Sequence, residues 1–226
     1  MAERKEATLI SRSGSVIELT FSNAVKAGDD VKVSQLLAEQ GVSLLTSEVS
    51  FDTTLSIDTR LTPPIIRKQS TVHRMESESG IAKGGKQCRE GIMTVTPFHL
   101  GLLARHRHII KIMLEAILEE KDPKLAFQWM EKVLNAKTAL TLPDQSVSCG
   151  KDTVSMNGMN AFHVAARYHS QGLKEILKTL QRKHWIPGFK YLLDEKSSSL
   201  LQTPLHIAAK QPTEEATRCQ FGIFSL

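Results

Sequence analysis

The stretch Thr203-Pro204-Leu205-His206-Ile207-Ala208-Ala209 decides the fold, because the chain contains two further versions of it. Thr96-Pro97-Phe98-His99-Leu100-Gly101-Leu102 is a near-copy, and Asn160-Ala161-Phe162-His163-Val164-Ala165-Ala166 is a degenerate copy. A unit that recurs at the head of successive apolar stretches is typical of a stack of repeats. We therefore expect a binding scaffold rather than a catalyst.

Each copy carries the signals of a helix start. Thr96 can cap a helix with its hydroxyl, and Pro97 suits the first helical position. Asn160 is a cap of the same kind in the next unit. A second helix is predicted from about His108, because the apolar residues that follow recur with helical spacing. Such a pair of helices cannot bury its apolar faces alone and must stack on a neighbour.

These residues resemble the ankyrin repeat, whose pattern is a Gly-x-Thr-Pro-Leu-His-x-Ala-Ala helix, a Gly-His turn and a Val-Val-x-Leu-Leu helix. The resemblance covers four segments, at about residues 18–41, 94–118, 157–181 and 201–218. It implies an all-α ankyrin-repeat solenoid of stacked helix-turn-helix units with long loop insertions and an incomplete C-terminal unit.

The chain departs from the family pattern in two ways. The turn glycine is Arg105 in one unit and His169 in another, where a left-handed backbone would be strained. His99 and His163 are also 64 positions apart, and His163 and His206 are 43 apart, against a family period of about 33. The stack must therefore contain insertions.

Three regions follow from these observations. Residues 1–45 are expected to hold an N-terminal tail and a degenerate first unit, 46–93 a flexible Ser/Thr/Gly-rich linker, and 94–226 the repeats with insertions. Ser70 follows Arg67-Lys68 and could be phosphorylated, although an unmodified loop is the alternative. Asp122-Pro123 predicts an additional helix, with Trp129 in the core.

Composition limits the class of protein. The 29 basic and 24 acidic residues give a net charge of +5 that is spread over the chain, so no nucleic-acid binding is expected. Three cysteines without a Cys-x-x-Cys spacing argue against a disulfide framework or a zinc site, and favour a cytoplasmic or nuclear location. No apolar stretch is long enough for membrane insertion by this chain itself.

The histidines at the same place in each repeated stretch can be interpreted in two ways. A metal site would need His99, His163 and His206 to converge, but equivalent residues of stacked repeats lie about 10 Å apart. In the ankyrin family this histidine forms hydrogen bonds within and between repeats. The chain also contains no nucleophile motif, phosphate loop or dinucleotide fingerprint. We therefore expect no enzyme activity and no cofactor.

The ankyrin resemblance implies that another protein binds at the loop tips and the groove side of the first helices. The residues of this sequence at those positions are Leu103, Arg105, Arg167, Tyr168 and Lys210. Because few residues follow Lys210, the last unit is expected to be incomplete. Two alternatives therefore stay open: a shortened N-terminal region of a larger ion channel or receptor, and a regulator of transcription factors like the NF-kappa-B inhibitors.

Overall fold

The computed structural model describes residues 9–10, 16–52, 92–141 and 156–210. Helices dominate it, as predicted. In chain order, its elements are β1 (Leu9–Ile10), α1 (Val16–Ala27), α2 (Asp30–Gln40), the 3-10 helix η1 (Val42–Thr46), β2 (Val49–Asp52), β3 (Ile92–Val95), α3 (Pro97–Leu103), α4 (Arg107–Leu118), α5 (Pro123–Asn135), β4 (Ala139–Thr141), α7 (Ala161–Tyr168), α8 (Ser170–Arg182), α9 (Ile186–Asp194) and α10 (Pro204–Ala209).

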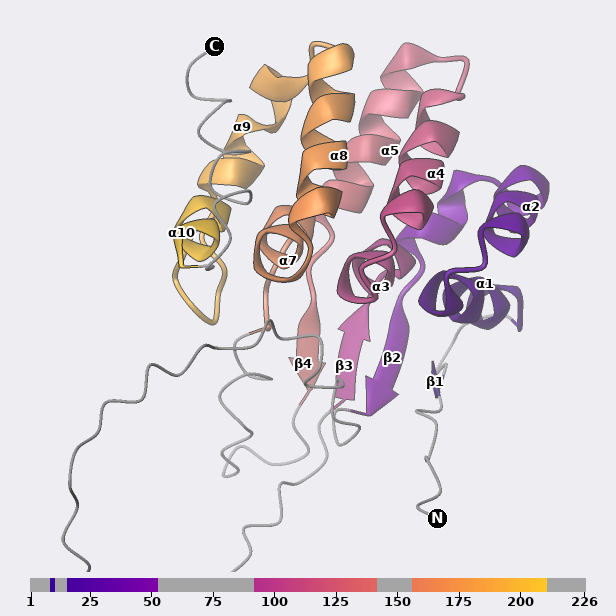
Figure 1. Cartoon of the computed structure of the whole chain (residues 1–226), viewed down its shortest axis with the longest axis horizontal. Coiled ribbons are helices and arrows are strands. Elements are labelled where there is room, and N and C mark those ends of the chain that lie inside the picture. Colours follow the sequence, from indigo (N-terminus) through magenta and orange to yellow (C-terminus); the bar gives the residue numbers. More distant parts are fainter. Residues whose placement is uncertain (1–8, 11–15, 53–91, 142–155, 211–226) are drawn as a thin grey trace, which may run out of the picture.

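The helices are stacked in three rows. In the first row α1, α3, α7 and α10 each contact the next; in the second row α2, α4 and α8 do so; in the third, η1, α5 and α9. Figure 1 shows α3, α7 and α10 nearly end-on, while α4 and α8 stand upright, with α5 behind them and α9 to the left of α8. The first two helices of a unit therefore cross steeply, and a third helix completes the unit.

Helices α5 and α9 of the third row are spaced along the chain like the helices of the other two rows. Helices α3, α4 and α5 begin 63 or 64 positions before α7, α8 and α9, and Pro123 and Pro187 both lie in the first turn of their helices. The predicted helix after Asp122 is confirmed as α5. Trp129 is only partly buried and packs against the core from α5.

The helix caps follow from local chemistry. The side chains of Thr96, Asn160 and Thr203 accept hydrogen bonds from the backbone N–H three residues later, and each begins a first-row helix. These three caps confirm the predicted helix starts. They leave the apolar side chains of each helix free to pack between the rows, where the core lies.

A small antiparallel sheet was not predicted. Its strand order is β1-β2-β3-β4, and Asp52 of β2 lies opposite Ile92 of β3. The prediction of a linker over residues 46–93 is therefore wrong at its ends, which are paired strands. The alternation in β3 buries Met93 and Val95, but a run of four residues is too short to distinguish from a loop by pattern alone.

The two turns without glycine differ from each other. Arg105 has a φ of 60°, in the left-handed region that the sequence predicts. His169 has a φ of −148°, so the same prediction is wrong there. Helix α7 continues to Tyr168, and His169 then serves both as its C-cap and as the N-cap of α8. No left-handed residue is needed because the two helices share this one residue.

Some predictions fall on residues outside the described ranges: Ser70, Cys88, Cys149, Cys219 and everything after Lys210, including the incomplete last unit. Within the described ranges, no helix has both the length and the apolar character that a membrane crossing requires.

Candidate partner-binding surface

The C-terminal ends of the first-row helices lie on one edge of the molecule. Helices α4 and α8 start from the ends of α3 and α7 and pack against each other, so those two ends face the same side. At the N-terminal ends of the helices, the His163 Nε2 in the first turn of α7 lies 3.1 Å from the carbonyl of Gln202, which comes just before α10. Helix α10 therefore runs beside α7 in the same direction. We call the edge formed by Arg105, Arg167, Tyr168 and Lys210 the turn surface.

The predicted contact residues do not all reach this edge. Leu103 is only 9% exposed and belongs to the hydrophobic core, so it is not available to a partner. Arg105, Arg167 and Tyr168 are half-buried, and Lys210 is exposed. The structure thus brings four of the five predicted residues to one edge.

Arg167 and Tyr168 form a local pair at the end of α7. The guanidinium carbon of Arg167 lies 5.3 Å from the centre of the Tyr168 ring. Stacking of this kind restricts both side chains. Tyr and Arg are also the residues that carry much of the energy in protein interfaces.

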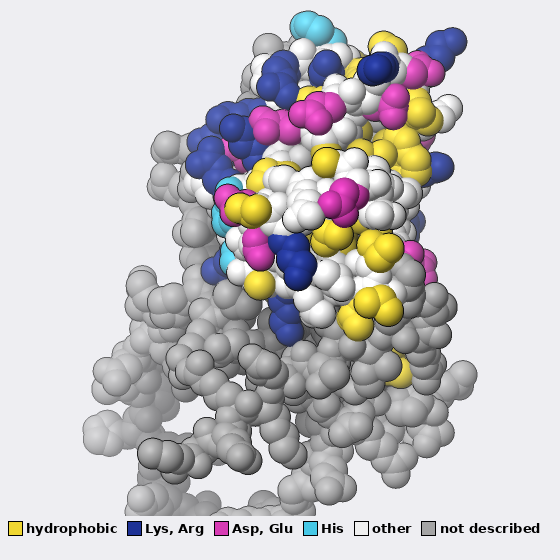
Figure 2. Space-filling view, turned by 90° about the vertical axis from the view of Figure 1, so that its right-hand side faces the viewer, with side chains coloured by type: hydrophobic (Ala, Val, Ile, Leu, Met, Phe, Trp, Pro, Cys, Tyr) yellow, Lys and Arg dark blue, Asp and Glu magenta, His cyan; other side chains and the backbone are white. Residues whose placement is uncertain are grey.

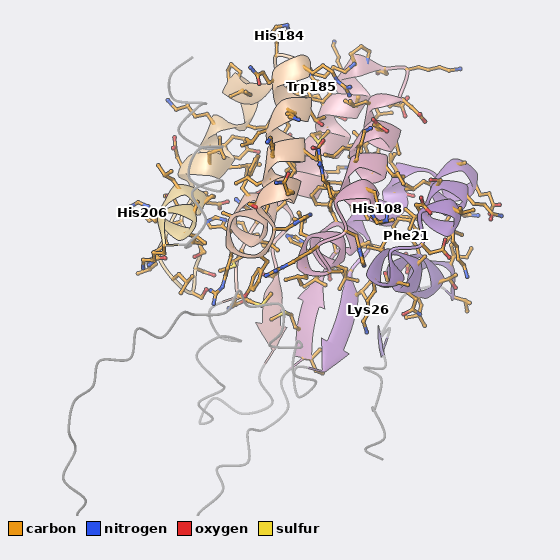
Figure 3. All side chains as sticks on the ribbon, in the orientation of Figure 1. Phe21, Lys26, His108, His184, Trp185 and His206 are labelled. Atoms are coloured by element: carbon orange, nitrogen blue, oxygen red, sulfur yellow. The ribbon has the colours of Figure 1, made fainter. Side chains whose placement is uncertain are left out.

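Two histidines at the start of α4 bond to the end of α1 and to the turn that follows it. His106 Nε2 lies 3.1 Å from the Lys26 carbonyl, and His108 Nε2 lies 3.2 Å from the Gly28 carbonyl. The ring of His106 fills the space that a Cβ at Gly28 would need. His108 and Lys26 both lie at the junction between α1 and the α3–α4 pair (Figure 3). We call this arrangement the histidine latch.

An ion pair joins helix α4 to helix α8. Arg107 donates through Nε and Nη2 to the Glu175 Oε1, at 3.1 and 2.6 Å. The Glu175 side chain is 12% exposed and that of Arg107 is 55% exposed. His169 lies beside this pair, and burial lowers its pKa to about 4, with help from the charges of Arg105, His106 and Arg107. His169 is therefore neutral at pH 7.

The three repeat histidines have a shared structural role. The Nδ1 atoms of His99, His163 and His206 lie 2.8, 2.6 and 2.7 Å from the side-chain oxygen of the preceding cap residue. Burial lowers the pKa of His99 to about 4 and also lowers that of His163. Across the described ranges, no three His, Cys, Asp or Glu side chains are placed to hold a metal ion. These histidines organise helix starts.

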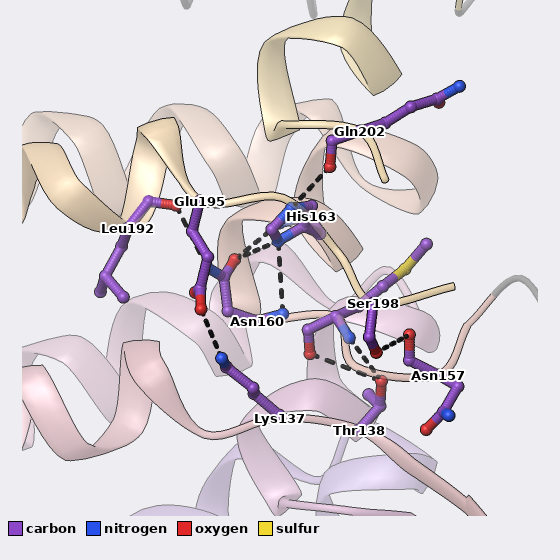
Figure 4. A network of polar contacts seen from close by, with 10 residues as sticks. Lys137, Thr138, Asn157, Asn160, His163, Leu192, Glu195, Ser198 and Gln202 are labelled. Atoms are coloured by element: carbon purple, nitrogen blue, oxygen red, sulfur yellow. Dashed lines mark hydrogen bonds and ion pairs between the residues drawn. The ribbon is translucent and has the colours of Figure 1, made fainter. Parts of the chain in front are cut away.

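A polar network surrounds His163 where the third unit meets the chain before α10 (Figure 4). Asn160 Nδ2 donates to the Leu192 carbonyl and to Glu195 Oε2, both at 3.1 Å. Glu195 also pairs with Lys137, which precedes β4. The network fixes the segment after α9 against α7.

Sequence reasoning missed the histidine latch, the Arg107–Glu175 pair and the network around His163. Each depends on residues more than 30 positions apart along the chain. No local pattern marks such pairs. To identify them, one must know which helices pack against each other and at which residues.

Comparison with known proteins adds no relative. The chain matches no protein-family model, and no curated protein or solved structure matches it either.

Proposed function

We propose that this chain is a non-enzymatic, ankyrin-type scaffold that binds another protein through the turn surface. The observation that carries the proposal is the Arg167–Tyr168 pair, which lies between Arg105 and Lys210 on one edge of the stack. The repeated Thr/Asn-cap and histidine arrangement supports the ankyrin-type assignment. In this proposal α5 and α9 are additions to the usual pair of helices.

The chemistry of the buried side chains fits a scaffold. Thr96 and His99 form a hydroxyl–imidazole pair at 2.8 Å, but they are 4% and 0% exposed, so no substrate can reach them. We further propose a cytoplasmic or nuclear location, since the odd number of cysteines lacks any framework spacing.

Affinity capture from cytosol with the full chain tests this proposal. The test variant is Arg167→Ala/Tyr168→Ala, and the matched control is Lys190→Ala/Tyr191→Ala, an adjacent pair of the same chemical types on α9. We expect a specific partner that the wild type and the control retain and the test variant loses. Arg167→Glu alone keeps the packing of Tyr168 and serves if the double variant unfolds.

Retention of every partner by the folded test variant would contradict the proposed turn surface. Equal loss in the test and control variants would show that capture depends on general stability instead of on this edge.

A further inference from the structure

The chain contains one asparagine that is followed by glycine. Asn23, Asn135 and Asn160 precede alanine, whereas Asn157 precedes Gly158. In an Asn-Gly pair the glycine nitrogen can attack the amide carbon of the asparagine side chain, because glycine has no Cβ to hinder the approach. Asn157 is therefore the asparagine of this chain that is chemically most open to such an attack.

The reaction is deamidation, and its only co-reactant is water. The Gly158 nitrogen loses its proton and forms a bond to the Asn157 Cγ, while the side-chain amide nitrogen leaves as ammonia and takes up a proton. Water then opens the resulting imide ring at either carbonyl carbon. The product is an aspartate or an isoaspartate in place of Asn157, and nothing is oxidised or reduced.

The fold holds the attacking nitrogen in a hydrogen bond. The Gly158 N–H donates to the Thr138 carbonyl at 2.8 Å. A hydrogen bond to the neutral form of a group opposes the loss of its proton. The Ser198 Oγ also donates to the Asn157 carbonyl at 3.3 Å, as Figure 4 shows. These two bonds fix the peptide group between Asn157 and Gly158.

Thr138 anchors the residues on both sides of this pair. It is 2% exposed, and its hydroxyl donates to the Met156 carbonyl and accepts from the Met159 N–H at 3.1 Å. The Thr138 N–H donates to the Met159 carbonyl at 3.0 Å. Opening of the turn at Asn157 therefore requires several bonds to one buried residue to break.

We propose that Asn157 is a deamidation site and that opening of this turn controls its reaction. In the closed turn the bond from the Gly158 N–H to the Thr138 carbonyl suppresses the attack. The reaction proceeds from the open turn, so its rate follows the population of the open form. The inference is independent of the proposed function, because this turn precedes α7, whereas the Arg167–Tyr168 pair lies at the end of α7.

The packing around Gly158 does not fit the isoaspartate product. A Cβ at Gly158 would lie 2.8 Å from the Ser198 Cβ and 3.1 Å from the Ser198 nitrogen. Isoaspartate adds a carbon to the main chain at Asn157, so Gly158 cannot keep its close contact with Ser198. We therefore expect the modified turn to stay open and to destabilise the protein.

Peptide mapping of the full chain by mass spectrometry tests the proposal. The wild type is aged at pH 7.5 in buffer and in concentrated urea, and the rate of deamidation at Asn157 is compared with that at Asn23 in the same digest. The test variant is Thr138→Val, which removes the hydroxyl that holds the turn. If Thr138→Val unfolds, Ser198→Ala replaces it, since it removes only the hydroxyl bonded to the Asn157 carbonyl.

The matched control is Thr20→Val. This change also removes a threonine hydroxyl that donates to a backbone carbonyl, that of Val16, at 2.7 Å. Helix α1 lies at the far end of the stack from α10 in Figure 1 and belongs to the face shown in Figure 2, where hydrophobic and charged side chains are interspersed. The control therefore leaves the turn at Asn157 intact.

We expect Asn157 of the wild type to react at least about tenfold faster in urea than in the folded chain, and faster than Asn23 in urea. In the folded chain, Thr138→Val should raise the rate at Asn157 about tenfold, as the loss of its hydrogen bonds would give. Thr20→Val should leave the rate unchanged. Chain deamidated at Asn157 should unfold at a lower temperature than an Asn157→Gln chain aged alongside it.

Equal rates at Asn157 in the folded and the unfolded wild type would overturn control by the turn, whatever the variants do. An unchanged rate in a folded variant of the turn would overturn it as well. A rate at Asn157 in urea no higher than that at Asn23 would overturn the choice of site, and equal unfolding temperatures would overturn the expected effect of the product.

Discussion

Buried neutral histidines make this protein sensitive to acid. Burial holds the pKa of His99 at about 4 in the folded chain, against an ordinary value of 6.5. Between these values the unfolded chain binds more protons than the folded chain, so stability is complete above pH 6.5 and falls as the pH decreases toward 4. The shift corresponds to about 3 kcal/mol in the free energy of unfolding.

Urea unfolding at pH 7.5 and at pH 4.5 measures this loss as a difference in the free energy of unfolding. His99→Gln should make that difference smaller. The dependence that remains comes from His163 and His169, whose pKa values are also lowered. An unchanged difference between the two pH values in His99→Gln would contradict the assignment.

The Arg107–Glu175 pair predicts a second effect of single residues. Arg107→Ala leaves a nearly buried carboxylate without its partner, at a cost of about 1–2 kcal/mol after allowance for the exposure of the arginine. Glu175→Gln in the same chain removes that charge and should restore part of the stability. A double-mutant cycle by urea unfolding checks this, and simple additivity of the two changes would refute the coupling.

Close packing between helices depends on one residue of α8. A Cβ at Gly172 would lie 2.5 Å from the Cδ2 of His169 and 2.7 Å from the Cδ2 of Leu102. Alanine normally favours a helix over glycine. Here we expect Gly172→Ala to destabilise the protein by about 1–3 kcal/mol, because the buried side chains of His169 and Leu102 must shift to make room. Gln181→Ala on the exposed side of α8 is the control and should change thermal stability little; a stabilised Gly172→Ala would contradict this packing.

The elements show why some of the fold could be predicted from sequence. Helix starts at Thr96, Asn160 and Thr203 were predictable, since cap and first-turn chemistry is local. The sheet was not, because its strands have two to four residues. The third row also escaped prediction: the cap at Asp122 marks α5, but only the contact between α5 and α9 shows that the two helices are equivalent.

The residues of the candidate surface divide in the same way, into those that a local pattern marks and those whose position depends on packing. Arg167 and Tyr168 could be predicted because they stand at a helix end in the repeat pattern. Leu103 stands at the equivalent end of α3 but faces the core. The direction of a side chain at a helix end depends on how the next helix packs, which the pattern alone does not contain.

At the scale of the whole molecule, units that contact only their neighbours should open separately. The histidine latch joins α1 and α2 to the rest of the stack. Loss of two hydrogen bonds in His106→Ala/His108→Ala should cost about 2 kcal/mol and accelerate amide exchange in α1 and α2 roughly thirtyfold. Exchange in α7 and α8 should stay unchanged.

Hydrogen-exchange mass spectrometry measures this, with His184→Ala, an exposed histidine after α8, as the control. Faster exchange throughout the stack would show that the molecule opens as a single cooperative unit.

The pairing of Asp52 with Ile92 has an evolutionary and practical consequence. Two strands held side by side bring Asp52 and Ile92 within about 5 Å of each other, whatever the length of chain between them. A two-residue Asn-Gly turn could replace the whole segment without moving either strand. Because the entropy of closing a loop grows only slowly with its length, this position can gain or lose sequence at little thermodynamic cost. It is the natural place to graft a reporter domain or to open new chain ends.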